Sequence, residues 1–137
     1  DIAAVMSRTP IWFQKGEEPK SIDFAKPFNF TFHDTGSRSE TKASIATVEK
    51  LFKNDPELVK TIDHRMEVAT FHAVQALKSG NPKILAHSLN QAQSCFDDWG
   101  LTHPDHKTMM DGLKSQGALA VKYTGSGQGG FLVALWS

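Results

Sequence analysis

Apolar residues recur at every third or fourth position through the middle of the chain, whereas they alternate or form short runs near its two ends. A period of three to four residues marks one face of a helix, and alternation or a short apolar run is typical of a strand. The pattern therefore predicts a helical centre between strands, which is an α+β domain. We expect strands at 2–6, 10–15, 28–33, 118–124 and 130–136.

Local signals divide the helical centre into four helices. Ser37 and Glu40 have the spacing of a capping box, which predicts a first helix that runs through Lys53. The second and third helices each begin at an Asp-Pro or Asn-Pro pair and end at a glycine. They are expected at 56–80 and 82–100, and a shorter fourth helix at 104–115.

One predicted strand carries Phe28, Phe30 and Phe32 at alternate positions, so their side chains point to the same face. Because three phenylalanines on one face favour burial, we expect this face to belong to the core. Asp34 and Thr35 follow the strand, and we expect them to shape the turn into the first helix.

Composition and length indicate an ordinary globular protein with one domain. The chain has 137 residues, of which 39% are hydrophobic and 22% are charged. Basic and acidic residues balance at 15 each, so no global field favours nucleic acid or an anionic membrane. The single Cys95 cannot form an internal disulfide, and we find no signal-peptide pattern or long apolar span. We therefore expect a cytoplasmic protein in which Cys95 is a buried apolar residue.

Four glycines, Gly125, Gly127, Gly129 and Gly130, lie between the last two predicted strands. Glycine at this density allows positive φ and close backbone approach, and successive N–H groups can form a concave site for phosphate. A hairpin turn would also use glycines, so both interpretations stay open. A Walker loop requires Gly-Lys-Ser/Thr and a dinucleotide fingerprint must open a helix, whereas here Phe131 begins an apolar run.

Three segments of the chain resemble the GHMP kinases. The last begins at Lys122 and reads Lys-Tyr-Thr-Gly-Ser-Gly-Gln-Gly-Gly, which resembles the third conserved motif in its mevalonate kinase form, Lys-Leu-Thr-Gly-Ala-Gly-x-Gly-Gly. The first, Asp1-Ile-Ala-Ala-Val-Met-Ser with Pro10-Ile-Trp-Phe-Gln-Lys-Gly, resembles the part of bacterial mevalonate kinases that begins at the active-site aspartate. Between them, His33-Asp-Thr-Gly and Thr41 resemble a strand end and helix start of that family. The similarity covers nearly the whole chain in the family's order.

The resemblance implies a GHMP kinase C-terminal domain, an antiparallel sheet packed with about four helices. It assigns residues 1–20 to the end of an N-terminal domain, as a strand pair and linker, and residues 21–137 to a truncated C-terminal domain. We therefore expect a fragment of a longer enzyme. Apolar surface that faced the missing domain should be exposed, so a homo-oligomer or self-association of the fragment is also expected.

The function implied by the resemblance is transfer of the ATP γ-phosphoryl group to the hydroxyl of mevalonate, a step of isoprenoid precursor synthesis. ATP and Mg²⁺ would be the cofactors, with the metal ligands in the missing N-terminal domain, so the fragment alone is expected to be inactive. Two alternatives stay open. One is another GHMP kinase such as phosphomevalonate kinase, and the other is a non-catalytic ligand-binding or assembly module of the same fold.

The resemblance also assigns roles to individual residues. Asp1 matches the catalytic aspartate beside the hydroxyl that receives phosphate, where a carboxylate can accept the proton or orient the oxygen. Thr41 matches a residue of the substrate pocket, although a threonine in the first helical turn is equally ordinary. The nucleotide-phosphate loop comprises Gly125, Ser126, Gly127, Gly129 and Gly130.

The histidines give only a weak signal for a metal. His103 and His106 are three positions apart with Asp105 between them, but a third ligand at a recognisable spacing is missing. A helix start explains these residues more simply, so we expect no metal site in the chain. The aromatic residues have apolar rather than basic neighbours, which argues against nucleic-acid stacking.

Overall fold

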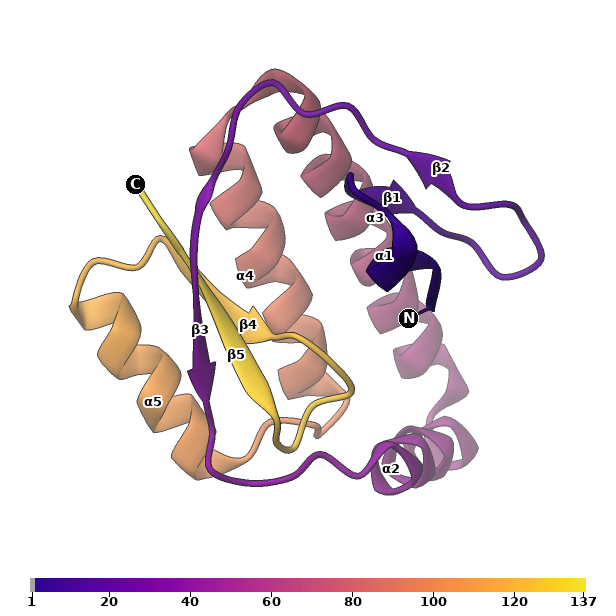
Figure 1. Cartoon of the computed structure of the whole chain (residues 1–137). Helices are drawn as coiled ribbons and strands as arrows, with labels where there is room; N and C mark the ends of the chain where they lie inside the picture. Colours follow the sequence, from indigo (N-terminus) through magenta and orange to yellow (C-terminus); the bar gives the residue numbers. More distant parts are fainter. Residues whose placement is uncertain (1) are drawn as a thin grey trace.

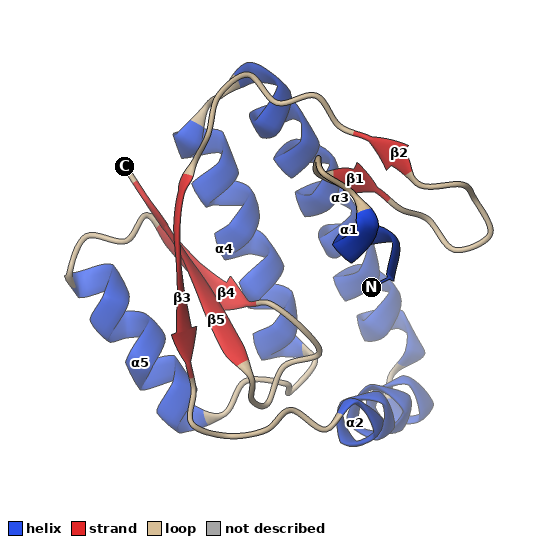
Figure 2. Ribbon diagram, in the orientation of Figure 1, coloured by secondary structure: helices blue, strands red, loops and turns tan. Residues whose placement is uncertain are grey.

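The computed structural model describes residues 2–137, which form five helices and five strands (Figure 1). In chain order they are α1 (Ile2–Met6), β1 (Ile11–Trp12), β2 (Lys20–Ser21), β3 (Asn29–Asp34), α2 (Thr41–Asn54), α3 (Pro56–Ser79), α4 (Pro82–Asp98), α5 (Pro104–Ser115), β4 (Ala120–Tyr123) and β5 (Phe131–Trp136). The α+β fold predicted from the sequence is confirmed (Figure 2).

The main sheet has the order β3-β5-β4, and both pairings are antiparallel. Side chains alternate between its faces, so Val121 and Ala120 point to opposite sides. Val121 packs in one cluster with Met110 of α5, and Ala120 packs in another with Ala76 of α3 and Leu85 of α4. The sheet therefore lies between α5 on one side and the α3–α4 pair on the other (Figure 1).

The predicted starts of the three later helices are confirmed by their caps. The Asp55 carboxylate accepts a hydrogen bond from the Leu58 N–H at 3.0 Å, and the Asn81 side chain accepts from the N–H groups of Lys83 and Ile84. His103 Nδ1 accepts from the Asp105 N–H at 3.2 Å. Each cap satisfies a donor that the first helical turn leaves free, and each precedes a proline that fits the first helical position.

The structure corrects the prediction at the N-terminal end. Residues 2–6 form the short helix α1, not a strand, because a five-residue apolar run with two alanines has no period that favours one over the other. The strand expected at 10–15 is reduced to β1, which pairs with β2. The predicted boundary at residue 20 falls within this strand pair, and the division into two domains remains a prediction.

The capping box predicted for the first helix is also wrong. The N-cap of α2 is Glu40, and it makes no side-chain cap bond. Ser37 is used differently, because its Oγ contacts His106 Nε2 at 3.0 Å. The predicted turn is present, since the Asp34 carboxylate accepts the Gly36 N–H at 2.9 Å.

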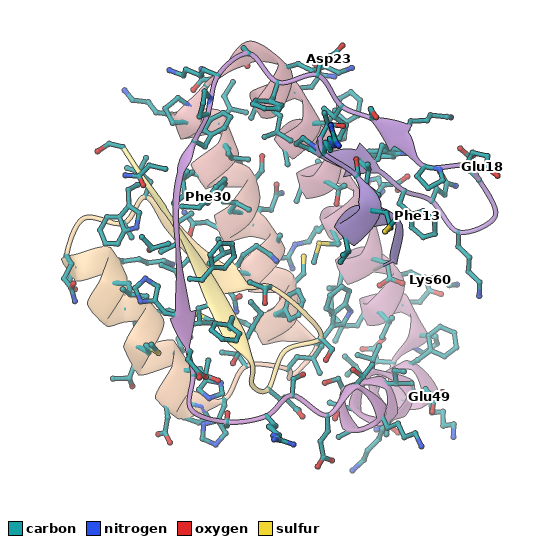
Figure 3. The ribbon with its side chains drawn as sticks, viewed as in Figure 1. Phe13, Glu18, Asp23, Phe30, Glu49 and Lys60 are labelled. Atoms are coloured by element: carbon teal, nitrogen blue, oxygen red, sulfur yellow. The ribbon has the colours of Figure 1, made fainter. Side chains whose placement is uncertain are left out.

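The predicted burial of the phenylalanine face is wrong for Phe30 and Phe32, whereas Phe28 packs against the core cluster that contains Leu135. Phe30 and Phe32 are 38% and 67% exposed, and Phe28 is half-buried. Phe30 lies opposite Leu135 and so on the face that α3 and α4 cover elsewhere (Figure 3). However, α4 packs over β4 at the far edge of the sheet, which leaves the face of the edge strand β3 uncovered.

Candidate functional site

The loop between β4 and β5 has a backbone that few residues could adopt. Gly127 and Gly130 have φ angles of 85° and 77°, and Gln128 between them has a φ of 58°. Positive φ is free of steric cost only for glycine. Gly127, Gln128 and Gly130 therefore all have a left-handed backbone, which is unstrained at the two glycines and less favourable at Gln128.

Two glycines also permit close contacts between backbones. A Cβ atom on Gly127 would lie 2.8 Å from the carbonyl oxygen of Leu101, and one on Gly129 would lie 2.6 Å from the carbonyl carbon of Arg38. Neither neighbour is a flexible side-chain end, so both segments would have to shift. These glycines thus fit the loop against two distant segments, around 38 and 101.

Hydrogen bonds secure the same contacts. The Gln128 N–H donates to the Leu101 carbonyl at 2.9 Å, and the Gly130 N–H donates to the Ser37 carbonyl at 2.7 Å. The Thr35 hydroxyl and N–H both donate to the Gly130 carbonyl, at 2.7 and 2.9 Å. The loop is therefore more than a simple hairpin turn, since two other segments of the chain, around residues 35–38 and 101, fix its shape.

Three successive N–H groups of the loop have no internal acceptor. Within residues 2–137, the N–H groups of Gly125, Ser126 and Gly127 donate no hydrogen bond to the chain. Gly125 is exposed, and a Cβ atom there would meet nothing within 4 Å. Ser126 is half-buried and Gly127 is buried. Adjacent backbone amides without an internal acceptor can bind an anion such as phosphate.

A cavity of about 750 Å³ adjoins the loop and is lined by α2, α3, the end of α4 and Ser126. Most of its wall is apolar, from Ile45, Val48, Phe52, Val59, Phe96, Trp99 and Leu101. Ser44 Oγ and Trp99 Nε1 are buried in this wall without a hydrogen-bond partner in the described part of the chain. Unpaired buried polar atoms are uncommon in proteins, so these two can serve a ligand. A ligand with an apolar body and a polar group suits this cavity.

The start of α2 meets the loop next to this cavity. Ser39 Oγ contacts Ser126 Oγ at 2.7 Å and donates to the Gly127 carbonyl at 2.8 Å. Thr41 is the first residue of α2, exposed, and two positions beyond Ser39. The structure thus brings the helix start that carries Thr41 to the glycine loop. Asp1 lies outside the described residues.

Comparisons with known proteins agree with this geometry. No family model matches the sequence. The chain is 28% identical over 95 residues to the mevalonate kinase of Methanothermobacter thermautotrophicus, which covers 69% of the chain and 31% of the relative. It is 24% identical over 140 residues to the mevalonate kinase of Aeropyrum pernix, which covers 99% of the chain and 42% of the relative.

The fold gives the same result. The structure of L. major mevalonate kinase in complex with R-mevalonate matches with a TM-score of 0.85 and 23% identity, over 93% of this chain and 39% of that one. The chain is similar to mevalonate kinases in sequence and in fold. It spans less than half the length of the mevalonate kinases that it matches.

Beside the loop that resembles the third mevalonate kinase motif lies a buried hydrogen-bond network that the sequence analysis missed. His106 is 5% exposed, and its Nδ1 contacts Tyr123 Oη at 2.7 Å. Tyr123 Oη also accepts the His103 N–H at 3.3 Å. Burial lowers the pKa of His106, with His103 as a second cause, and burial raises the pKa of Tyr123. The Nε2 of His106 contacts the Ser37 hydroxyl, so His106 joins α5 and β4 to the segment that is hydrogen-bonded to Gly130.

Both histidines make hydrogen bonds within the chain, His103 at the start of α5 and His106 to Tyr123 and Ser37. Among residues 2–137, no group of three His, Cys, Asp or Glu side chains is placed to hold a metal ion. Within the same range, no helix combines the length and the apolar character needed to cross a membrane.

Lys122 is the second feature that the sequence analysis missed. Its Nζ donates a hydrogen bond to the Tyr123 carbonyl and lies 5.5 Å from the centroid of the Phe96 ring. Burial lowers the pKa of this lysine to about 8. The only sequence signal was its place at the start of the mevalonate kinase motif, because Phe96, the ring beneath its amine, comes from α4.

Proposed function

We propose that this chain is the C-terminal part of a small-molecule kinase that transfers the γ-phosphoryl group of ATP to the hydroxyl of mevalonate. The observation that carries the proposal is the fixed loop with free amides at Gly125, Ser126 and Gly127, next to a ligand-sized cavity. In phosphoryl transfer the protein mainly positions the groups and stabilises charge, which free amides do without reorganisation. The similarity to mevalonate kinases supports the substrate and the pathway of isoprenoid precursor synthesis.

The loop would hold the nucleotide phosphates, and the acceptor would lie toward the cavity and the start of α2. Thr41 would line the acceptor site, because its helix start is joined to the loop through Ser39 and Ser126. We propose that Asp1 orients the acceptor hydroxyl and accepts its proton as the oxygen forms its bond to phosphorus. The bond between the γ-phosphorus and the bridging oxygen breaks in the same step, and ADP leaves.

The residues of the loop suit phosphate, whereas Mg²⁺ would have to be bound elsewhere. The described residues contain no cluster of three metal-ligating side chains, so we propose that another domain supplies the ligands. When bound, Mg²⁺ would neutralise charge on the β- and γ-phosphates. This agrees with the assignment of residues 21–137 to the C-terminal domain of a two-domain enzyme, preceded by the end of an N-terminal domain at 1–20.

The cavity favours a second candidate within the same class. Its wall is mostly apolar and its volume is about 750 Å³, which suits a ligand of drug-like size. An acceptor with a larger apolar body than mevalonate would cover more of this wall. Another GHMP kinase acting on a different alcohol is therefore the alternative function.

The test is ADP formation by the full-length protein with ATP, Mg²⁺ and a panel of acceptors. The panel contains mevalonate, phosphomevalonate and alcohols with longer apolar chains. We expect mevalonate to give the highest kcat/KM. A higher value for another alcohol would select the alternative, and nucleotide binding without turnover of any acceptor would indicate a non-catalytic module.

A further inference from the structure

Lys122 is placed where the strand β4 leads into the glycine loop. Its side chain is half-buried, and the only hydrogen bond of its Nζ within residues 2–137 goes to the neighbouring Tyr123 carbonyl. The Phe96 ring lies beneath it, with the centroid 5.5 Å from Nζ. The amine therefore stands on an aromatic surface and meets no other polar group of the described chain.

This lysine has no anionic partner in the described part of the chain. The ion pairs found there involve Lys20, Lys60, His64, Arg65 and His103. Burial lowers the pKa of Lys122 to about 8. A partly desolvated cation without a counter-charge is costly, so its presence needs an explanation.

Lys122 and Gly127 of the glycine loop share a neighbour, the Phe96 ring. A Cβ atom on Gly127 would lie 3.1 Å from Phe96 Cδ1, so Gly127 and the Lys122 amine both lie against the Phe96 ring. The amide groups of Gly125, Ser126 and Gly127 are the nearest free donors along the chain. The Lys122 amine and Gly127, the last residue of the run of free amides, therefore lie against one ring. A lysine cation and free backbone N–H groups both favour an anion.

We propose that Lys122 is the charge partner of a ligand phosphate group that binds to the amides of Gly125, Ser126 and Gly127. On binding, Nζ would exchange the Tyr123 carbonyl for a phosphate oxygen, as a lysine point charge does in other phosphate sites. This inference rests on the proposed function, because it assigns the loop to a phosphate. It adds a positively charged side chain to a site that would otherwise consist of backbone groups.

A purely structural role makes a different prediction. If the side chain only covers Phe96 with its methylene groups, methionine would replace it without loss, since it has a similar length and no charge. If the charge binds phosphate, arginine should serve and methionine should not. Lys122→Met and Lys122→Arg therefore separate the two roles.

The experiment is a titration of the 137-residue chain with inorganic pyrophosphate at pH 7, followed by amide NMR shifts. In the wild type we expect shifts at Gly125, Ser126 and Gly127. Lys122→Met should weaken the affinity at least about tenfold, and Lys122→Arg should keep it within about threefold. Lys114→Met is the matched control, because Lys114 is an exposed lysine at the end of α5 and its loss changes the net charge equally.

A second measurement remains decisive if Lys122→Met does not fold. From pH 7 to 9 the wild type should lose affinity for pyrophosphate relative to Lys122→Arg, because the lysine, with its pKa of about 8, becomes neutral and arginine stays charged. The inference would be overturned if the pyrophosphate affinities of wild type and Lys122→Arg changed equally from pH 7 to 9. It would also be overturned if Lys122→Met bound pyrophosphate as tightly as the wild type. Absence of pyrophosphate binding at the loop would also overturn it. Pyrophosphate binding that depends on Lys122, without kinase activity of the full-length protein, would refute only the proposed function.

Discussion

The Ser39 hydroxyl donates a hydrogen bond to the carbonyl of Gly127, 88 residues later in the chain, at 2.8 Å. The same Oγ contacts Ser126 Oγ at 2.7 Å. One short side chain thus joins the start of α2, where the acceptor is proposed to bind, to the loop proposed to hold phosphate. This contact, together with the hydrogen bonds of Thr35 and Ser37 to Gly130, fixes the relative placement of the two halves of the site.

Replacement of Ser39 by alanine should weaken this junction. A partly buried hydrogen bond contributes about 1 kcal/mol, so we expect Ser39→Ala to lower the free energy of unfolding by roughly 1 to 2 kcal/mol. Chemical denaturation of the 137-residue chain measures the change. Ser115→Ala is the control, because its Oγ bonds to the Asp111 carbonyl within its own exposed helix end. Equal decreases in the free energy of unfolding of the two variants would show that the Ser39 contact stabilises the fold no more than an exposed hydrogen bond does.

The glycines of the loop should respond differently to alanine. At Gly129 a Cβ atom would lie 2.6 Å from the Arg38 carbonyl carbon, so we expect Gly129→Ala to destabilise the chain by about 2 kcal/mol or more. At Gly125 nothing lies within 4 Å, so Gly125→Ala should leave the melting temperature nearly unchanged. In the full-length protein, Gly125→Ala should still raise the KM for ATP, because the added methyl group would occupy open space next to the free amides. Unchanged ATP kinetics in this variant would argue against phosphate binding at Gly125.

Local sequence signals predicted the helices well. They could not predict which faces of the strands are covered by segments distant in the sequence. Asp55 caps α3 through a bond to its own first turn, which neighbouring residues suffice to specify. Phe30 was read correctly as lying on one face of a strand. Whether that face is covered depends on α4, which packs over β4 at the other edge of the sheet.

In the candidate site, too, local signals could be predicted from the sequence and long-range contacts could not. The density of glycines predicted an unusual loop, and the contact of Gly129 with Arg38 gives the physical reason. The role of Lys122 depends on Phe96, which comes from α4. That of His106 depends on Ser37 and Tyr123. Burial of a titratable group is set by such long-range contacts, so a single sequence cannot reveal it.

The buried histidine should make stability depend on pH. Because burial lowers the pKa of His106, the folded chain prefers the neutral ring. The unfolded chain binds the proton first, so this stabilisation is complete above the ordinary histidine pKa of about 6.5 and is lost as the pH falls through the lowered value. The free energy of unfolding should therefore fall more steeply from pH 6.5 to 5 in the wild type than in His106→Gln. His64→Gln, at an exposed histidine, is the control and should keep the wild-type slope.

Asp1 ties the chain most directly to the proposed chemistry. A carboxylate beside the acceptor hydroxyl acts late, as the proton leaves, and asparagine preserves its shape but cannot accept that proton. In the full-length protein we expect Asp1→Asn to lower kcat by on the order of a hundredfold or more, the scale of a positioned general base. The KM for mevalonate should change much less, since the side chain keeps its volume and its hydrogen bonds. Steady-state kinetics with ATP and mevalonate, together with circular dichroism to check the fold, measure this. A folded variant with near-normal kcat would remove Asp1 from the proposed active site and would weaken the proposed mevalonate kinase function with it.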